Sequence, residues 1–318
     1  MAYMTFVSGI ELSRRFYAEA VAPVVRGPHS AALAGTGSEV LGFDTERSTD
    51  HNWTARVFLF LPDLRVVPDV PATFLGHTTN LVVARLGDWA RDVLGFDPRR
   101  PRLHDWLATP TQVFAEFTGG AVFHDDLGLG ALRDAVAWYP DDVWRYVLAC
   151  QWQRISQEEA FVGRSGEVGD ELGSAVVAAR LVRDLMRLCL LMARRYPPYS
   201  KWLGSAFAQL PAAADLTPSL TGALAATTWR ERERHLATAY ETAAELHNAL
   251  GLTEPVDPRT GPYYDRPFRV VNAGRFVAPL LAGSPLDVPI GAIDQFVDST
   301  DALGHRALTR AVVDCAHG

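Results

Sequence analysis

The chain has 318 residues, 48% of them hydrophobic, and carries a formal net charge of −7. This length suits two modest domains with packed cores, and the acidic balance argues against a general nucleic-acid-binding surface. No apolar run approaches the roughly 20 residues that span a bilayer, and Cys150, Cys189 and Cys315 show no paired spacing. We therefore expect a protein of the reducing cytoplasm with no membrane partner.

The first third of the chain alternates helix and strand. Apolar spacing predicts a helix over Ser8 to Val25, with Ser8 as its cap, and a short buried strand over Ala31 to Ala34. Two further strands are expected, at Val57 to Leu61, which Pro62 ends, and at Leu81 to Ala84. Helices are expected at residues 86–94 and 109–116.

From Tyr139 onward the pattern is mostly helical. We expect a strand-like segment at Phe268 to Val271 and helices at residues 141–162, 170–195, 229–250, 275–281 and 290–303. Gly163 to Gly166 is expected to break the first of these helices. The fold class is α+β, with a mixed sheet flanked by helices and then a mainly helical domain.

Gly119 and Gly120 mark the expected domain boundary, which gives a first domain of residues 1–118 and a second of residues 119–318. Phe123 to Asp126 could equally belong to the first domain. His124 in this segment is a conceivable metal ligand, but a histidine beside two aspartates is more often part of a solvated turn.

One stretch of the first domain has the order that nucleotidyl transfer needs. A small-residue turn, Gly35 to Ser38, precedes the polar triplet Asp50-His51-Asn52 by about a dozen residues, and the apolar run at 57–61 follows. Glycines let backbone N–H groups approach phosphate oxygens. If the triplet is extended, Asp50 and Asn52 lie on one face, with His51 on the other. Phosphate contacts thus precede metal-holding oxygens.

This turn and triplet resemble the signature of the polymerase-β-like nucleotidyltransferase superfamily. The fuller text, with Leu41-Gly42-Phe43-Asp44 between them and Trp53 after the triplet, looks like a bacterial branch of uncharacterised nucleotidyltransferase-like proteins. The resemblance implies an N-terminal nucleotidyltransferase-like sheet, phosphate contacts from Gly37 and Ser38, and Mg²⁺ held by Asp50 and Asn52. It covers most of the chain for the branch and the first third for the superfamily.

The chain departs from the superfamily pattern in its acids. The pattern has a second carboxylate where this chain has Asn52, and a third on a later strand, for which the expected counterpart, Leu81 to Ala84, has none. Asn52 offers a neutral oxygen, so the site keeps a ligand and loses a negative charge.

Three residues of the second domain complete the candidate site. Pro197 to Trp202 looks like a motif of the same branch, in which Lys201 would contact nucleotide phosphates beside Tyr199. The alternative is a connector whose aromatics anchor a core. Glu159 is the candidate general base for an acceptor hydroxyl, or else part of a solvated helix face.

Two functions follow from these residues. The first is Mg²⁺-dependent transfer of a nucleoside monophosphate from a nucleoside triphosphate to the hydroxyl of a small-molecule acceptor, with no nucleic-acid partner expected. The second is a nucleotidyltransferase fold that has lost its chemistry and binds a nucleotide or a partner. The Gly-Ser turn, Asp50 and the single lysine of the chain, Lys201, favour the first. The absent carboxylates favour the second.

Overall fold

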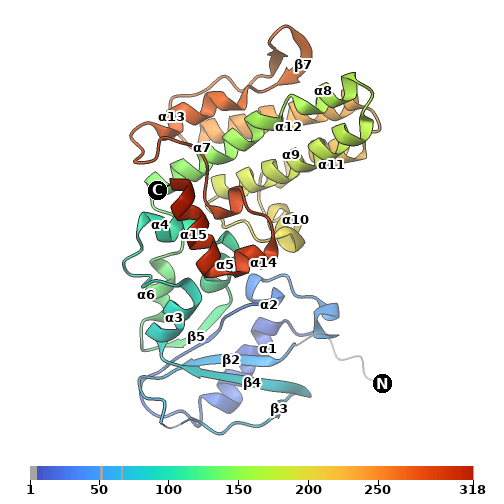
Figure 1. Cartoon of the computed structure of the whole chain (residues 1–318). Helices are drawn as coiled ribbons and strands as arrows, with labels where there is room; N and C mark the ends of the chain where they lie inside the picture. The colour runs from blue at the N-terminus through green and yellow to red at the C-terminus, as the bar shows by residue number, and fades with distance from the viewer. Residues whose placement is uncertain (1–5, 51–52, 66, 318) are drawn as a thin grey trace, which may run out of the picture. The chain divides into compact units, whose positions relative to one another are not determined.

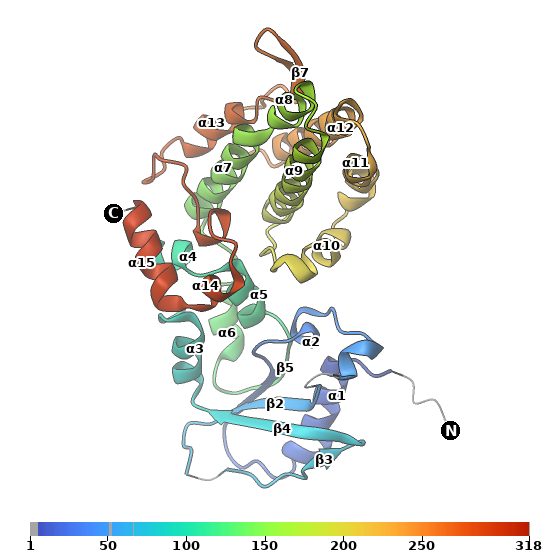
Figure 2. The ribbon, with the colours of Figure 1, turned by 45° about the vertical axis from the view of Figure 1, so that its right-hand side comes forward.

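The computed structural model describes residues 6–50, 53–65 and 67–317, with Asp50 by its backbone only. The chain divides into two compact units, and each is described by itself (Figures 1 and 2). The first consists of residues 1–105 and 111–138, and the second of residues 106–110 and 139–318. The mixed sheet and the helical second part agree with the expected α+β class.

A five-stranded mixed sheet forms the centre of the first unit, in the order β3-β4-β2-β1-β5. The strands are β1 (Ser30–Leu33), β2 (Ala55–Phe60), β3 (Thr73–Phe74), β4 (His77–Ala84) and β5 (Ala121–Asp125). β1 lies antiparallel to β2 and β5, whereas β2 and β4 are parallel. The helices and helical turns of this unit are α1 (Gly9–Phe16), η1 (Tyr17–Val21), α2 (Ser38–Leu41), η2 (Glu46–Asp50), α3 (Leu86–Leu94), α5 (Thr111–Thr118) and α6 (Leu129–Asp134).

Helices cover both faces of this sheet (Figure 1). On one face, α1 packs its buried Leu12 and Phe16 against alternate residues of β2, such as Val57. On the other face, the ring of Trp89 from α3 lies 5.0 Å from Phe60 of β2 and 5.0 Å from Phe117 of α5. Side chains on the two faces of β2 therefore pack into two separate cores.

The expected boundary at residue 118 differs from the division in the structure. β5 pairs with β1 through Ser30 opposite Asp125 and Ala31 opposite His124, so the segment after Gly120 completes the first sheet. The backbone pairing of β5 needs a neighbouring strand, and β1 supplies it. The first unit therefore extends to Trp138, as the alternative placement of Phe123 to Asp126 allowed.

The second unit is mainly helical. Its helices and helical turns are α7 (Asp141–Glu158), α8 (Phe161–Glu167), α9 (Glu171–Met192), α10 (Ser200–Ala208), α11 (Ala213–Ala225), α12 (Trp229–Ala249), η3 (Ala273–Phe276), α13 (Val277–Leu281), η4 (Ile293–Gln295), α14 (Thr300–Gly304) and α15 (Arg306–His317). A hairpin is made by β6 (Gly261–Tyr263) and β7 (Arg266–Val270), and α4 (Leu103–Ala108) runs from the first unit into the second. None of the described helices has the length and apolar character that a membrane crossing requires.

Two expected features of the second unit are wrong. Gly163 and Gly166 lie inside α8, at positions where a Cβ atom would come within 2.4 Å of the Phe268 ring and 2.1 Å of the Trp229 ring, respectively. These glycines permit close packing and do not break the helix. The helix expected over residues 290–303 is instead the short turn η4 and the separate helix α14, which Ser299 caps.

Candidate functional site

The Gly-Ser turn connects β1 to α2. Gly35 and Gly37 have φ angles of 84° and 137°, a region that L side chains rarely adopt, and Ser38 is the first residue of α2. A Cβ atom on Gly37 would lie 2.5 Å from the Glu39 carboxylate oxygens. The turn therefore requires glycine at residue 37 both for its backbone angle and for the space it leaves.

An arginine that the sequence analysis did not assign holds this turn. Arg56 of β2 donates through one guanidinium nitrogen to the Thr36 carbonyl at 2.7 Å and to Glu39 Oε1 at 2.7 Å. The side chains of Arg56 and Glu39 are largely buried, with 16% and 15% of their surfaces exposed, respectively. Burial lowers the pKa of Arg56, while the negative charges of Glu39 and Glu116 oppose this shift. The signal in the sequence is a single charged residue at the start of an otherwise apolar strand.

The residues after the turn bind the start of α1. Asp44, the last residue of the Leu-Gly-Phe-Asp text, accepts a hydrogen bond at 2.6 Å from the backbone nitrogen of Gly9. A Cβ atom on Gly9 would come within 2.6 Å of Glu39 Cβ and 3.2 Å of Trp53 Nε1. The first turn of α1 thus lies against both the Gly-Ser turn and the residue that follows the polar triplet.

Asp50, the first residue of the polar triplet, does not have the extended backbone that was expected. Asp50 is the last residue of the 3₁₀ turn η2, and β2 begins at Ala55, so an extended backbone at residue 50 is wrong. Hydrogen bonds of Ser48 and Thr49 with residues 45 and 46 stabilise the turn locally. His51 and Asn52 lie outside the described residues, as does the side chain of Asp50.

The parallel pairing of β2 and β4 defines which residues lie beside the end of the triplet. Ala55 is opposite Thr79, whereas Leu81 to Ala84 pair with Val57 to Phe60 farther along the strand. The Trp53 ring lies 4.9 Å from the His77 ring at the start of β4. β4 reads His-Thr-Thr-Asn-Leu-Val-Val-Ala and contributes no carboxylate at any position.

Two carboxylates beside the turn already have partners within the protein. Among the described residues there, the carboxylates of Glu39 and Asp44 are already bound to Arg56 and to the Gly9 backbone. A two-metal arrangement needs further carboxylates that β4 does not contain.

A pocket of about 570 Å³ opens beside Trp53 in the first unit. Its lining includes Leu12 and Arg15 of α1, Thr49 of η2 and His77 of β4. A largely apolar pocket of this size, with a few polar groups, is suited to a small ligand. Trp53, the residue that follows the polar triplet in the sequence, therefore lines a pocket of ligand size.

Lys201 and Tyr199 lie in the second unit, at the start of α10. Tyr199 is the residue before the helix, with 37% of its surface exposed, and Lys201 is exposed in the first turn. The Lys201 ammonium lies 4.8 Å from the centre of the Trp202 ring, which is a cation–π geometry. Both residues belong to the second unit, and their role at a nucleotide stays a prediction.

Glu159 is a buried carboxylate at the end of α7, with 7% exposure, so a solvated helix face is wrong. Its Oε1 accepts a hydrogen bond at 2.9 Å from the backbone nitrogen of Ala273. Burial raises its pKa to about 7, although backbone N–H groups of residues 271–273 and Arg275 act in the opposite direction. A carboxylate of this pKa can exchange a proton near neutral pH, as a general base must. The role of Glu159 as a base stays a prediction.

Comparisons with known proteins give two findings. The family model described as Domain of unknown function (DUF4037) matches residues 106–203. A solved structure, a nucleotidyltransferase-like protein from Exiguobacterium sibiricum 255-15, is similar over 86% of this chain and 88% of that chain, with 12% sequence identity and a TM-score of 0.33. No curated protein matches the chain.

Proposed function

We propose that this protein is of the nucleotidyltransferase kind and binds a nucleoside triphosphate with Mg²⁺ through its first unit. The main support is the Gly35–Ser38 turn between β1 and α2, in which both glycines have positive φ angles. Backbone N–H groups in such a turn can receive phosphate oxygens. Asp50 and Asn52 would hold the Mg²⁺, and the pocket beside Trp53 is a candidate place for the base.

The reaction that this arrangement would serve is nucleotidyl transfer. The hydroxyl oxygen of a small-molecule acceptor forms a bond to the α-phosphorus, and the bond from that phosphorus to the pyrophosphate oxygen breaks. The acceptor proton passes to a base, for which Glu159 is the candidate, and pyrophosphate leaves. Lys201 and Tyr199 would contact the nucleotide. Positioning and charge stabilisation supply most of the catalysis in such transfers.

A second candidate function is a nucleotide-binding module without transfer activity. The specific observation in its favour is that β4, the strand parallel to β2, carries no carboxylate. The described acids beside the turn are bound to Arg56 and Gly9. Under this alternative the first unit binds the triphosphate and reports its presence.

Binding is tested by comparing Gly37→Ala with Gly251→Ala in calorimetric titrations of Mg²⁺ and ATP, GTP, CTP or UTP. Both glycines have positive φ angles, but a Cβ atom collides with Glu39 only at residue 37 and meets nothing within 4 Å at residue 251. We expect the Gly37 variant to lose binding and the Gly251 variant to retain it. No heat from the parent with any of the four nucleotides would overturn the proposal.

Transfer is separated from binding by Asn52→Asp. The added carboxylate should increase the stabilisation that Mg²⁺ gives to the protein and lower its stability without metal, because two like charges then lie close together. A rise in pyrophosphate release would favour the enzyme, whereas stronger Mg²⁺ binding without release would favour the binding module. An unchanged Mg²⁺ response would mean that Asn52 does not line a metal site.

A further inference from the structure

The pairing of β1 with β5 brings two histidines and an aspartate to one face of the sheet. Ala31 is opposite His124, and the ladder continues past β1, since the Asp126 nitrogen donates to the His29 carbonyl at 2.9 Å. Alternate residues of a strand point to the same face, so His29, His124 and Asp126 share the face on which Ala31 packs against α1. His29 and His124, 95 positions apart along the chain, thus become neighbours.

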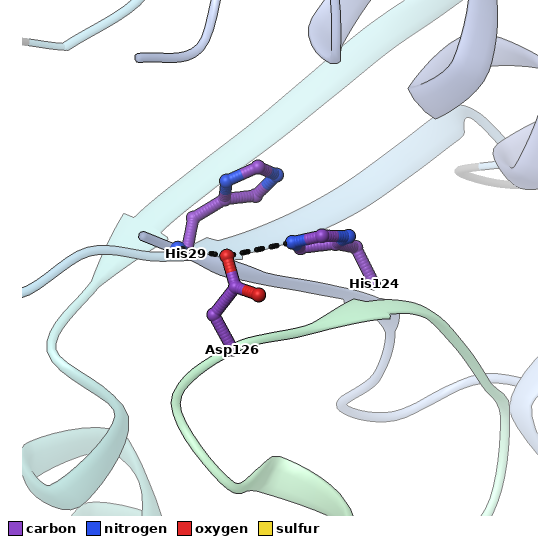
Figure 3. Close-up of side chains that lie close together, drawn as sticks. All are labelled: His29, His124 and Asp126. Carbon is purple, nitrogen blue, oxygen red and sulfur yellow. Dashed lines mark hydrogen bonds and ion pairs between the residues drawn. The ribbon is translucent and has the colours of Figure 1, made fainter. Parts of the chain in front are cut away.

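The three side chains lie close enough to share one ion (Figure 3). His124 Nε2 is 2.8 Å from Asp126 Oδ2, and the rings of His29 and His124 are stacked with their centres 4.2 Å apart. One possible ligand atom from each residue lies within 4.8 Å of the others, and no other group of three His, Cys, Asp or Glu residues in the described part of the chain meets this condition. His124 and Asp126 are 38% and 46% exposed, which gives an ion a path from solvent.

The neighbouring residue Asp125 fixes the backbone of this cluster. Its carboxylate accepts hydrogen bonds from the nitrogens of Gly128, Leu129 and Gly130 at 2.8–2.9 Å. Ser30 also donates to Asp125 at 2.6 Å. Asp125 thus holds the loop, while the partly exposed Asp126 carboxylate accepts a hydrogen bond at 3.3 Å from the backbone nitrogen of His29.

Hydrogen bonds at His29 leave a lone pair on Nε2 that could bind an ion. His29 Nδ1 is 3.1 Å from the Gly27 carbonyl, which can only accept, so Nδ1 carries the proton in this bond and Nε2 carries the lone pair. The Tyr17 hydroxyl lies 2.9 Å from Nε2. Tyr17 begins the π-helical turn η1, a type of turn that is frequent at functional sites. An ion would replace the Tyr17 proton as the partner of Nε2.

We propose that His29, His124 and Asp126 bind one Zn²⁺ ion, with a water molecule as the fourth ligand. Two imidazoles and a carboxylate suit Zn²⁺, whereas Mg²⁺ prefers oxygen ligands alone, so this site is distinct from the one at Asp50. Ligand atoms about 2.0–2.1 Å from a tetrahedral ion lie about 3.3 Å from one another. The present separations, from 2.8 Å to at most 4.8 Å, bracket this value, and the two stacked rings would turn on binding so that a lone pair of each points at the ion. The bound ion would connect β5 to β1 at the edge of the sheet.

The test is a calorimetric titration of the full chain with ZnCl₂ at pH 7.5, without nucleotide, followed by thermal melts with ZnCl₂ or MgCl₂. We expect one ion per chain and a higher melting temperature with Zn²⁺ only. His124→Ala and Asp126→Asn should each weaken Zn²⁺ binding about tenfold or more. His235→Ala, which removes a histidine of α12 in the second unit, is the matched control and should bind as the parent does.

Asp126→Asn keeps the shape of the side chain, so a loss of Zn²⁺ binding in this variant does not depend on misfolding. Co²⁺ provides a second readout, because a tetrahedral site with two nitrogen ligands gives visible absorption bands that the variants should lack. Equal Zn²⁺ affinity in the parent, His124→Ala and Asp126→Asn would overturn the proposal, as would the absence of binding in the parent.

Discussion

At the scale of single residues, the turn between β1 and α2 depends on a charge pair. The Glu39 carboxylate lies over Gly37 and is held by Arg56, which also binds the Thr36 carbonyl. The pair therefore determines the shape of the segment that we propose to hold phosphate. Breaking one partner of a largely buried pair leaves the other charge without compensation.

We predict that Glu39→Gln lowers the free energy of unfolding by about 1–3 kcal/mol, because Arg56 then stays buried beside a neutral group. Chemical denaturation of the parent and the variant measures this loss. Asp63→Asn is the matched control, since Asp63 and Arg65 form an exposed pair and the change should have no measurable effect. Equal stability of the parent and Glu39→Gln would contradict the structural role of the pair.

Lys201 gives the second prediction at this scale. If Lys201 contacts phosphate, Lys201→Ala should weaken the binding of ATP about tenfold or more and leave the binding of adenosine unchanged, since adenosine carries no charge. Titrations with the two ligands measure both affinities. Equal losses for ATP and adenosine would instead assign Lys201 to packing on the Trp202 ring, from whose centre its ammonium lies 4.8 Å.

At the scale of elements, Glu159 connects the end of α7 to the turn that begins η3. Asn272 in this turn has a φ angle of 51°, and the nitrogen of the next residue, Ala273, donates to Glu159. The folded protein keeps the proton of Glu159 up to a pKa of about 7, against an ordinary value of 4.5. The unfolded chain therefore loses this proton at lower pH, so the stability falls as the pH rises from about 4.5 to about 7.

We predict that Glu159→Gln removes this pH dependence. Glutamine keeps the acceptor oxygen for Ala273 and carries no titrating group, so the variant should gain up to about 3 kcal/mol relative to the parent between pH 4 and pH 8. Denaturation curves at both pH values measure the change. Glu158→Gln, at the neighbouring position where the carboxylate pairs with Arg180, is the control. A stability difference that is the same at both pH values would contradict the raised pKa.

Local patterns in the sequence predicted most elements of the first unit. Residues 86–94 form α3 as expected, with Gly95 in the left-handed region after it, because the apolar spacing and the terminal glycine give the same boundary. The site was harder to predict. The Gly37–Ser38 turn and the strand after the triplet follow from local signals, whereas the contact of Arg56 with Thr36 depends on the pairing of strands distant in sequence.

In the second unit, long-range packing decided the features that local patterns missed. Gly163 and Gly166 have the composition of a helix break, but the rings of Phe268 and Trp229, far along the chain, occupy the space beside them. Glu159 gave no signal of burial, because its Ala273 partner lies 114 residues away. His124 was expected in a solvated turn, and only the β1–β5 pairing shows that His29 stacks on it.

At the scale of the whole molecule, the chain combines a sheet unit and a helical unit, and the proposed functions divide between them. The Gly37–Ser38 turn, Asp50 and the pocket beside Trp53 belong to the first unit, and Lys201 and Glu159 belong to the second. Within the first unit, the turn and Asp50 would hold the phosphates and the Mg²⁺, whereas the proposed roles of Lys201 and Glu159 are tested by their own variants.

The proposal rests above all on the binding of a triphosphate by the turn at Gly37 and Ser38. A crystal structure of the protein grown with ATP and Mg²⁺ tests it directly. We expect density for the phosphates against the backbone nitrogens of the turn and for one Mg²⁺ beside Asp50. A structure with ATP bound elsewhere and an unchanged, empty turn would contradict the account.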